Sequence, residues 1–531
     1  MPAILDHNGR PMPTASERRQ ADVVRRARAR LSASYDAAQT TSENENHWSA
    51  ADGLSAAKAN SPEIRNKLRR RARYECDNNC YASGMLQVLA LHTVGTGPRL
   101  QLQSPFPEAN AAVEQAFAAW AMRSRLARKL RTARIAKAKD GESLLVRVNN
   151  PRLADPVKLD LWGPECDQLT SPIDRYSAFP DDRYDDGITL DEFGNPVKYD
   201  ILKHHPGDGT FGGGRYGLDS RSYNADDVIH LFREDRPGQR RGVPEILPAL
   251  PLFSQLRRYE MAVLAAAETA ADFSAVMYTD NPAMDPDDIP NLSSDEPLEI
   301  TKRMFQILPN GWKMAQLRAE QPTAQFKDFR AAIIAEAARC ILMPYNVAAG
   351  DSSDMNYSSG RLDHQTYFRA VAVDRNDLEI EALTTKIFPW WLDEAARLAV
   401  ADPDYRLPII FDAGRLWIVG DDQILPFNFS WVHWQWDGFE HVDPAKESNA
   451  ADTRIKGGTW HRALDYSRQG LDIDAEDGRA AASYGVSIEE YRQALFRSHF
   501  QQPGPTANPQ LDAEPLSPPT EQSRRTHALK N

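Results

Sequence analysis

The cysteines of this chain are the first residues from which a metal site could be built. Cys76 and Cys80 are spaced i, i+4 and would lie on one face of a helix, where two thiolates could share a zinc ion. A closed zinc site needs four ligands, and the sequence offers no clear candidates for the other two. We therefore interpret both cysteines as core or surface residues and expect no metal site.

The histidines do not follow a catalytic pattern. His204 and His205 are adjacent, and His433 and His441 follow far downstream. Neither pair has the His-Glu-x-x-His spacing of a zinc protease, and no Gly-x-Ser-x-Gly elbow accompanies them. No Gly-x-x-x-x-Gly-Lys-Ser/Thr segment occurs either, so nothing indicates that the chain hydrolyses ATP. These patterns favour structural histidines, no catalytic residues and no cofactor.

A polar loop, residues 344–361, lies between two helical runs. Asp351 and Asp354 within it could bind a cation, but the loop lacks the regular oxygen-ligand spacing of a calcium loop. A long polar loop between long helices is usually a mobile functional element rather than a packing element. The loop is therefore the strongest candidate for function, with a chemistry other than catalysis.

Three helical runs must position this loop. Residues 323–343 place apolar side chains on one stripe at helical spacing, and Pro344 disfavours helix beyond that point. Helical pattern resumes near residue 359 and continues to about residue 400, where Pro389 should kink or split it. Further upstream, the alanine-rich residues 244–275 predict a stiff helix that packs closely against its neighbours.

An anionic segment separates the first two of these runs. Residues 280–299 contain seven acidic residues and four prolines, without one Lys or Arg. We expect it to be extended, and two strands at 304–308 and 314–317 to form a small sheet after it.

A basic strip occurs within a helix predicted at residues 107–138. Eight basic residues and no acidic one lie between Arg123 and Lys139. Such a run is either a phosphate-facing strip or one side of a protein interface that meets an acidic neighbour. In a chain with a formal charge of -12 we favour the interface. Its candidate residues are Arg123, Arg125, Arg128, Lys129 and Arg131.

The remaining patterns predict an α+β protein. A helix from Pro62 is expected to run through Asn79 to Val94, and a hairpin is expected around the turn at 191–196. The aromatic run at 427–436 favours a buried strand over a stacking platform for sugars or bases. Other predicted strands are residues 100–102, 143–148, 157–162, 228–232, 409–411 and 416–419.

Composition sets the outer limits. The 531 residues predict two to four domains, and 41% hydrophobic with 26% charged residues is ordinary for a soluble protein. Four scattered cysteines and a start without an apolar signal core favour folding in a reducing cytoplasm. The most apolar helical run, residues 259–277, holds three carboxylates, so we expect no membrane span. The net negative charge argues against a chain that simply wraps nucleic acid.

Several short stretches together resemble one family, the portal proteins of tailed bacteriophages of the lambda type. Their order and spacing over residues 48 to about 400 are specific, whereas residues after about 445 match less sharply. The stretches are Leu68-Arg-Arg-Arg-Ala-Arg-Tyr, Asn78-Asn79, Val94-Gly-Thr-Gly97, Ile188 with Gly194-Asn-Pro-Val-Lys-Tyr199, Val228-Ile-His230-Leu-Phe, Arg236-Pro-Gly-Gln-Arg-Arg-Gly242-Val-Pro244 and Asn356-Tyr-Ser-Ser-Gly-Arg361.

The resemblance implies a phage portal fold that assembles as a ring, usually of twelve subunits, at one capsid vertex. Double-stranded DNA would be packaged and later ejected through the ring. The implied division is a basic N-terminal helix and arm (1–60), a wing (61–243), stem helices (244–275 and 323–343), a clip (276–322), a tunnel loop (344–361), a long kinked helix with a wing or crown β region (362–445), a helical crown (446–500) and a disordered tail (501–531).

The resemblance also implies partners and site residues. Partners would be further copies of the chain, the terminase large subunit, the major capsid protein, head-completion or tail connector proteins and non-specific DNA, in a virion assembled in the host bacterial cytoplasm. The tunnel-loop residues facing DNA would be Gly350, Asp351, Ser352, Asp354, Met355, Asn356 and Tyr357. The clip residues facing the terminase or connector would be Asp280, Asp285, Asp287, Asp288 and Glu296.

Two other functions remain open at this stage. One is a capsid assembly adaptor or scaffold that binds capsid protein without forming a channel. The other, which the missing motifs disfavour, is a metal-dependent enzyme that processes DNA.

Overall fold

The computed structural model describes residues 19, 20, 23, 45–171, 183–208, 219–272, 276–279, 312–315, 325–353, 356–439 and 444–500. The chain divides into two compact units, one of Met1–Ser61 with Asp235–Gln239 and one of the remaining residues. Helices and antiparallel sheets both occur in the larger unit, which confirms a mixed α and β fold. No helix among the described residues is long and apolar enough to cross a membrane.

In the smaller unit, one short helix is described in full. Helix α2 (Ala56–Ala59) begins at Ser55, whose side chain accepts a hydrogen bond from the Lys58 amide. Arg236 Nη2 donates to the Leu54 carbonyl at 3.0 Å and so holds the two segments of this unit together. Most of the basic helix expected within residues 1–60 lies outside the described residues, although 19, 20 and 23 are helical.

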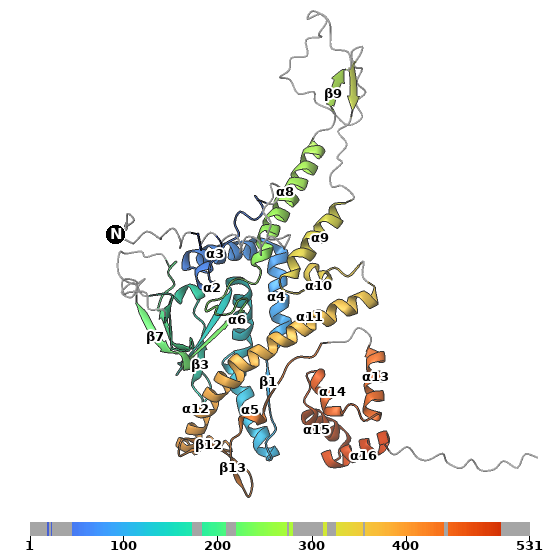
Figure 1. The fold of residues 1–531 in the computed structure, drawn as a ribbon. Helices are drawn as coiled ribbons and strands as arrows, with labels where there is room; N and C mark the ends of the chain where they lie inside the picture. The colour runs from blue at the N-terminus through green and yellow to red at the C-terminus, as the bar shows by residue number, and fades with distance from the viewer. Residues whose placement is uncertain are drawn as a thin grey trace, which may run out of the picture. The chain divides into compact units, whose positions relative to one another are not determined.

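The larger unit contains most of the helices (Figure 1). They are α3 (Pro62–Asn78), α4 (Cys80–Val94), α5 (Pro107–Arg123), α6 (Leu126–Asp140), α8 (Leu250–Asp272), α9 (Phe326–Arg339), α10 (Tyr345–Ala349), α11 (Tyr357–Leu378), α12 (Phe388–Ala401), α13 (Pro444–Lys456), α14 (Arg462–Arg468), α15 (Ile473–Tyr484) and α16 (Ile488–Phe500). Short 3-10 turns are Cys166–Gln168, Ala225–Asp227, Leu247–Ala249 and Phe429–Trp431.

Two helices that were predicted to be continuous are broken, so those predictions are wrong. The first breaks at Asn79, which has an extended backbone and whose side-chain Oδ1 accepts hydrogen bonds from the amides of Tyr81 at 3.0 Å and Ala82 at 3.2 Å. The second breaks at Arg125, which takes a left-handed conformation with φ of 56°. Helical periodicity persists on both sides of each break, whereas an asparagine side chain that caps a helix competes locally with the backbone bond.

Pro389 was predicted to kink or split the long helix, and the structure shows a change of winding before it instead of a split. A π-helical stretch, Glu379–Ile387, joins α11 to α12, and the Phe388 amide donates to the Leu383 carbonyl five residues back. Proline has no amide hydrogen and its ring crowds the carbonyl four residues earlier, so a wider turn before Pro389 relieves the clash. The long helical run therefore continues past the proline with a local change of winding.

Five small antiparallel sheets complete the described fold. Strand β1 (Arg99–Leu102) pairs with β14 (Val432–Gln435), and β9 (Val276–Thr279) pairs with β10 (Trp312–Ala315). The other sheets, in spatial order, are β3 (Leu159–Trp162), β2 (Glu142–Asn149) and β8 (Val228–Phe232); β4 (Tyr184–Asp185), β5 (Ile188–Leu190), β6 (Pro196–Leu202) and β7 (Ser220–Asn224); and β11 (Ile409–Asp412), β12 (Arg415–Val419) and β13 (Ile424–Pro426).

Most predicted strands coincide with these sheets, and one prediction needs correction. Only the end of the aromatic run at 427–436 is a strand, because Phe429–Trp431 forms a 3-10 turn before β14. The strand expected at 314–317 overlaps β10, which pairs with β9. Residues 304–308, the expected partner, lie outside the described residues.

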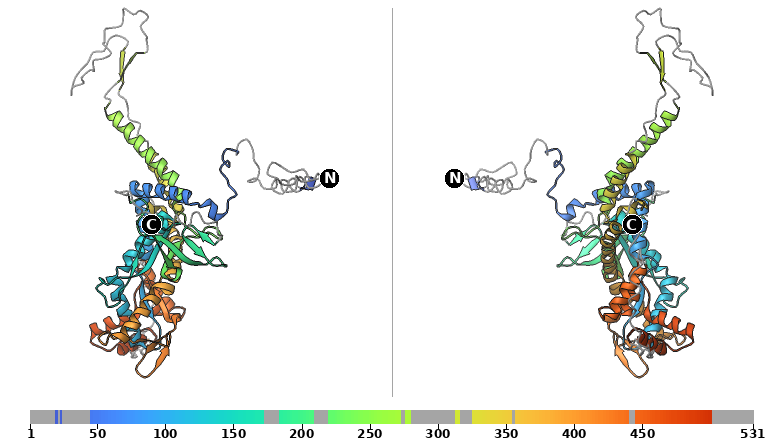
Figure 2. Two further views of the ribbon diagram at one scale, coloured as in Figure 1. Left: turned by 90° about the vertical axis from the view of Figure 1, so that its left-hand side faces the viewer. Right: turned by 90° about the vertical axis from the view of Figure 1, so that its right-hand side faces the viewer.

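Two apolar cores hold the helices α3 to α6 and α8 to α12 of the larger unit. One is aromatic and gathers α5, α12 and β14, where Phe117 meets Trp391 edge-on with ring centroids 5.2 Å apart. The other gathers α3, α4, α8, α9 and α11 around the buried side chains of Phe253 and Tyr367. Both views of Figure 2 draw α8 as one straight helix, whose N-terminal part, including Phe253, enters the second core.

Two glycines let backbones touch where β2 begins. Gly141 has a φ of 92°, and a Cβ atom on it would lie 2.5 Å from the Val243 carbonyl carbon. A Cβ atom on Gly242 would lie 1.9 Å from the Gly141 carbonyl oxygen. Any side chain at Gly242 therefore requires the two segments to move apart.

We expect Gly242→Ala to destabilise the protein by about 3 kcal/mol, because overpacking against backbone cannot be relieved by a rotamer change. The matched control is Gly84→Ala in α4, where nothing lies within 4 Å of a new Cβ atom. That change should raise stability by up to about 1 kcal/mol through helix propensity. Thermal unfolding midpoints measure both effects, and equal midpoints for the two variants would contradict the close approach.

Candidate functional site

Two helices and the loop after them form the region that the sequence singled out. Helices α8 and α9 pack through aromatic side chains, with Tyr259 stacked on Phe326 at 5.7 Å and edge-on to Phe329 at 5.0 Å between ring centroids. Helix α8 ends at Asp272 and α9 begins at Phe326, so the pair brackets the anionic segment as predicted. The five clip candidates, Asp280, Asp285, Asp287, Asp288 and Glu296, lie outside the described residues.

The loop is shorter than the predicted span of 344–361. Pro344 has an extended backbone and caps the five-residue helix α10, in which Ala348 is buried. Gly350 then ends α10 in a left-handed conformation with φ of 66°. Helix α11 already begins at Tyr357. The predicted loop was too long because a proline cap and two alanines suffice for one helical turn that buries its apolar side.

The described loop residues are polar and carry negative charge. Ser353 donates to Asp351 Oδ1 from its amide at 3.0 Å and from its hydroxyl at 2.7 Å. These hydrogen bonds lower the pKa of Asp351, so the carboxylate is ionised at neutral pH. Ser352 and Asn356 are exposed. Two further candidates, Asp354 and Met355, lie outside the described residues.

A hydrogen bond between the described residues joins the two sides of this loop. Asn346 Nδ2 of α10 lies 2.8 Å from His364 Nε2 of α11. The loop therefore leaves and re-enters the fold at points that are tied to each other.

Glu142 lies at the centre of a buried charge cluster, here called the Glu142 junction. The cluster joins α3, β2 and β8 to the segment that leads into α8. The Glu142 side chain is fully buried and accepts from both Arg69 of α3 and Arg241. The amide of Gly242 donates to Glu142 Oε2 at 2.9 Å, and His230 Nε2 of β8 lies 3.1 Å from the same oxygen. One carboxylate thus joins a helix, two strands and the segment before α8.

The charges of the Glu142 junction compensate each other. Burial alone would raise the pKa of Glu142, but the guanidinium groups of Arg241 and Arg69 outweigh it and hold the pKa well below its ordinary value. Burial lowers the pKa of His230, which favours the neutral imidazole. A buried carboxylate with two cationic partners is stable only while both remain in place.

A second cluster, here the Asp374 junction, ties α11 to the same region. Arg134 of α6 pairs with Asp374 of α11, and its Nη1 lies 3.0 Å from Glu245 Oε2. Lys137 Nζ lies 3.0 Å from Asp374 Oδ1. Burial would raise the pKa of Asp374, but Arg134 and Lys137 hold it below its ordinary value. Through the two junctions, α6 and β2 fix both the approach to α8 and the helix that follows the loop.

Three of the five candidate residues of the basic strip contact carboxylate or carbonyl groups of the same chain. Arg123 Nη1 lies 2.7 Å from Asp155 Oδ2, and Lys129 pairs with Asp160. Arg131 donates to the Gly95 carbonyl. We predicted an acidic neighbour from another subunit, and for these three residues the recorded partners are internal. Arg125 and Arg128 are exposed and have no ion pair within the described part of the chain, so the interface prediction stays with them.

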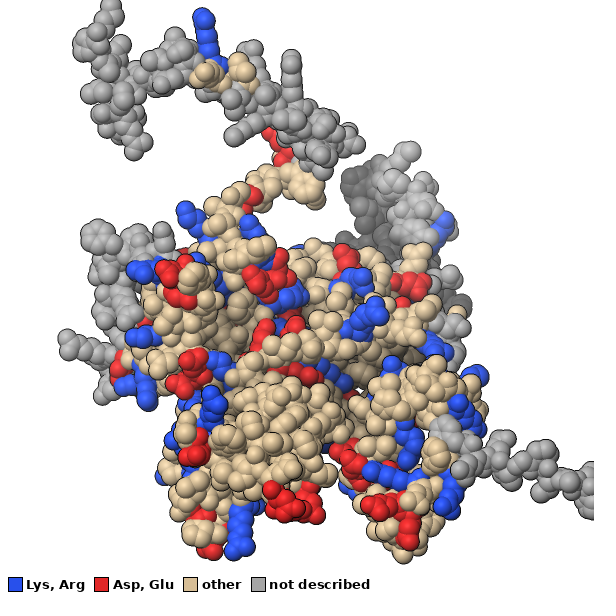
Figure 3. Space-filling model, turned by 60° about the horizontal axis from the view of Figure 1, so that its bottom comes forward, with Lys and Arg blue, Asp and Glu red and all other residues tan. Residues whose placement is uncertain are grey.

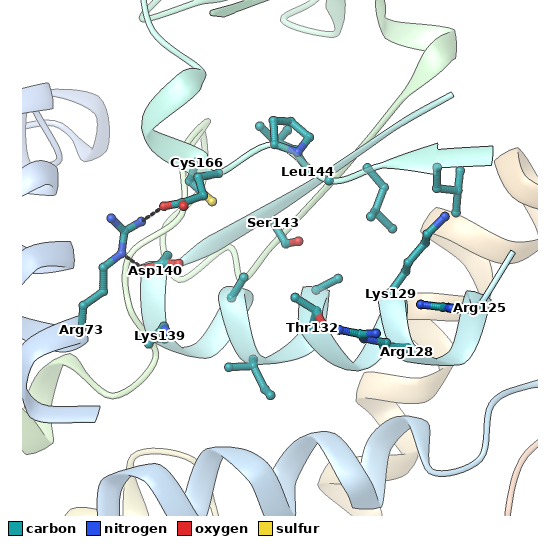
Figure 4. Close-up of a pocket in the computed structure, with 18 of the residues that line it drawn as sticks. Arg73, Arg125, Arg128, Lys129, Thr132, Lys139, Asp140, Ser143, Leu144 and Cys166 are labelled. Atoms are coloured by element: carbon teal, nitrogen blue, oxygen red, sulfur yellow. Dashed lines mark hydrogen bonds and ion pairs between the residues drawn. The ribbon is translucent and has the colours of Figure 1, made fainter. Parts of the chain in front are cut away.

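A cavity of about 560 Å³ opens beside α6. Figure 4 shows Arg125, Arg128 and Lys129 on one stretch of the helix, with Ser143 and Leu144 of β2 across the cavity. The floor is apolar and the rim is mainly basic. Its charged residues are Arg73, Asp77, Arg125, Arg128, Lys129, Lys139, Asp140 and Glu165.

One group of possible metal ligands occurs among the described residues. Glu165, Asp167 and His205 place ligand atoms within 4.8 Å of one another. Arg73 Nη1 lies 2.6 Å from Asp167 Oδ2, so a fixed guanidinium already occupies the position next to these carboxylates. A metal cation there would be repelled by that charge. We assign the group to the charged core that surrounds α3.

The cysteine pair does not form a joint site either. Asn79 separates the two helices that carry Cys76 and Cys80, and the first is buried whereas the second is exposed. Burial raises the pKa of the Cys76 thiol to about 12, so it stays protonated at neutral pH. Cys76 therefore lacks the accessible setting of a reactive thiolate.

Sequence reasoning missed the two junctions. The only sign of them in the sequence was that Arg69 and Arg241 lie in two of the stretches that carry the family resemblance. A charged residue within such a stretch is ordinarily assigned to the surface. Only the fold shows that Glu142 and Asp374 gather these charges inside the protein.

On the face drawn in Figure 3, blue and red side chains are interspersed with each other and with tan areas. Proteins that grip DNA displace its counterions with lysine and arginine side chains. A mixed surface of this kind does not provide a continuous track for phosphates on that face.

Three comparisons relate the chain to known proteins. The family model described as "Phage portal protein, lambda family" matches residues 42–375. A "Probable portal protein" of Halomonas phage phiHAP-1 is 24% identical over 463 residues, which is 81% of this chain and 83% of the relative. Among solved structures, a chain of the "Virion of native gene transfer agent (GTA) particle" is 14% identical with a TM-score of 0.39, covering 78% of this chain and 97% of that one. A chain from "Neck of native GTA particle computed with C12 symmetry" is 15% identical with a TM-score of 0.37, at the same coverage.

We expect Glu142→Gln to destabilise the protein by about 3 to 5 kcal/mol, because two buried guanidinium groups lose their counter-charge. The matched control is Asp393→Asn, which breaks a partly exposed i, i+4 pair with Arg397 and should cost no more than about 0.5 kcal/mol. Thermal unfolding midpoints compare the two. Similar small losses for both variants would contradict a compensating role of Glu142.

The stability difference between the wild type and Glu142→Gln should depend on pH. Because the folded-state pKa of Glu142 is lowered, its stabilisation is complete above the unfolded pKa of about 4.3 and is lost as the pH falls toward the folded value. The gap between the midpoints of the wild type and Glu142→Gln should therefore narrow below about pH 4.3. A gap that is constant from pH 7 to pH 3 would contradict this linkage.

Proposed function

The chain belongs to the lambda family of phage portal proteins, and we propose that it forms a closed ring at one vertex of a phage capsid, through which double-stranded DNA is packaged and ejected. Members of this family are structural proteins of the phage particle. The observation that carries the ring-and-channel proposal is the succession of α8, the bracketed anionic segment, α9, α10, the polar loop and α11. A stem with an inserted clip, followed by a channel loop, needs this order.

The proposed parts follow from that succession. Helices α8 and α9 are the stem, residues 276–322 the clip and residues 350–356, between α10 and α11, the tunnel loop. Residues 61–243 are the wing, and the helices α13 to α16 belong to the crown. A ring of twelve copies is our proposal for the assembly, in the virion after formation in the host cytoplasm.

The two junctions give this arrangement a mechanical basis. Glu245, immediately before the turn that leads into α8, and Asp374 of α11 share Arg134 as their partner. Stem root and loop helix are thereby fixed to α6 of the wing. We infer that the wing acts as a rigid frame and that movement during DNA passage is concentrated in the loop.

The loop is proposed to guide DNA without holding it. Asp351 is ionised and repels phosphates, whereas exposed polar side chains such as Ser352 can contact them weakly. Tight binding would need cations that displace counterions. The force for packaging would come from the terminase large subunit docked on the clip, and the other partners would be the major capsid protein and the head-completion or tail connector proteins.

The purified chain should form closed rings with a central hole in negative-stain micrographs. Such rings are the direct consequence of the portal proposal, whereas a capsid adaptor or scaffold needs no channel. The rings should also show no ATPase activity and no magnesium- or manganese-dependent nuclease activity. A protein that remains monomeric, or assembles without a hole, under conditions of full solubility would overturn the proposal.

Trimming residues 350–357 should leave ring assembly intact but impair DNA packaging or retention, because the loop contacts the channel rather than the neighbouring subunit. DNA protection from nuclease in a terminase-driven packaging reaction measures the effect. Loss of the ring itself would contradict the assignment of this loop.

A charge reversal refines this test. Asp351→Lys should slow packaging and raise the salt-sensitive affinity of rings for DNA, since lysine binds phosphates. Asp421→Lys makes the same change at an exposed turn between β12 and β13 and serves as the control. Equal effects of the two reversals on packaging and DNA affinity would contradict a specific role of the loop.

A further inference from the structure

The turn between β5 and β6, here the Phe193 turn (residues 191–195), presents an aromatic ring to solvent. Phe193 is 81% exposed, the highest value among the large hydrophobic side chains of the described residues. Its neighbour Glu192 is also exposed and has no ion pair within the described part of the chain. A single exposed apolar residue is ordinary on a protein surface. Whether Phe193 can anchor a partner therefore depends on the structure of the turn that carries it.

The Phe193 turn is rigid. Asp191 Oδ1 accepts hydrogen bonds from the amides of Phe193 at 2.9 Å and Asn195 at 2.7 Å, and Asp191 Oδ2 accepts from Asn195 Nδ2 at 2.9 Å. Gly194 supplies the left-handed residue, with φ of 88°. These bonds lower the pKa of Asp191, so they persist at neutral pH. A preorganised turn loses little conformational freedom on binding, which makes Phe193 a suitable anchor.

The cavity beside α6 has the complementary character. Its floor is formed by apolar side chains such as Leu144, Leu145 and Leu161. Arg125, Arg128 and Lys139 line it and form no ion pair with a carboxylate within the described part of the chain. The cavity of about 560 Å³ lies within the usual range of ligand-sized pockets, about 300 to 1,000 Å³. An aromatic ring flanked by a carboxylate would fill the floor and neutralise the rim.

We propose that the Phe193 turn of one copy docks into the α6 cavity of a neighbouring copy. The inference rests on the proposed ring function and names an interface within it. Two different surfaces on one chain make a heterologous contact, and such contacts close into rings when the rotation permits. Glu192 then meets Arg128 or Arg125, and Phe193 lies over the apolar floor between α6 and β2.

A reciprocal charge swap tests the contact. Glu192→Arg and Arg128→Glu should each raise the protein concentration at which half of the chains are in rings at least about tenfold, because like charges face each other across the interface. The double variant should recover most of that loss. Phe193→Ala should weaken assembly to a similar extent without a rescue by charge.

The controls separate this inference from general damage and from the ring proposal itself. Phe496→Ala and Arg497→Glu make the same kinds of change on exposed positions of α16 and should leave assembly unchanged. A wild type without rings would overturn the proposed function. Wild-type rings together with normal assembly of all three turn and cavity variants would overturn only this contact. If the variants form normal rings that fail to enter capsids, the turn contacts another capsid protein and the contact between copies is overturned.

Cross-linking gives an independent readout. Glu192→Cys combined with Thr132→Cys, an exposed position in the cavity, should form disulfides between copies when Cys80→Ser removes the exposed native thiol. A disulfide requires Cα atoms within about 7 Å, so a ladder of covalent oligomers on a non-reducing gel supports the contact. Rings of the double-cysteine variant that run as monomers on this gel, as the single-cysteine variants should, would contradict it.

Discussion

The fold depends on a buried carboxylate, Glu142, whose charge must be compensated by fixed partners. Glu142 is fully enclosed and accepts from two guanidinium groups and one backbone amide, so helix α3, strand β2 and the segment before α8 must meet at one point. Desolvating such a group is costly unless its partners are fixed, and the close approach of Gly141 and Gly242 keeps them there. Charge compensation and backbone contact therefore specify the same geometry.

The Asp374 junction extends this constraint toward the loop. Arg134 is shared by Glu245 and Asp374, so a displacement of α11 would leave either carboxylate without its cation. A portal must transmit force from a motor to a capsid while DNA moves past it. Buried ion pairs join α6, the segment before α8 and α11, the elements that we propose as parts of the wing, the stem and the loop, and so stiffen the place where the three meet.

Sequence patterns predicted much of the fold because hydrophobic periodicity and proline are local signals. The strand at Val228–Phe232 is such a case, and Pro389 marked a place where the helix is disturbed, although as a π-helical stretch rather than a split. Breaks set by one residue were missed, since Asn79 caps a helix without disturbing the periodicity on either side. The charged junctions were missed for a different reason: they join residues far apart in the chain, and local composition cannot distinguish a buried arginine from a solvated one.

A side-chain-resolution cryo-EM reconstruction of the assembled ring tests the central claim most directly. The claim is that two buried charge clusters hold each subunit so that the polar loop faces a DNA channel. The reconstruction should show the polar loop, residues 350–356, around the central hole, with Glu142 enclosed by Arg69 and Arg241 inside every subunit. A loop on the outer rim of the ring, or a Glu142 that pairs with a neighbouring subunit instead, would contradict the account.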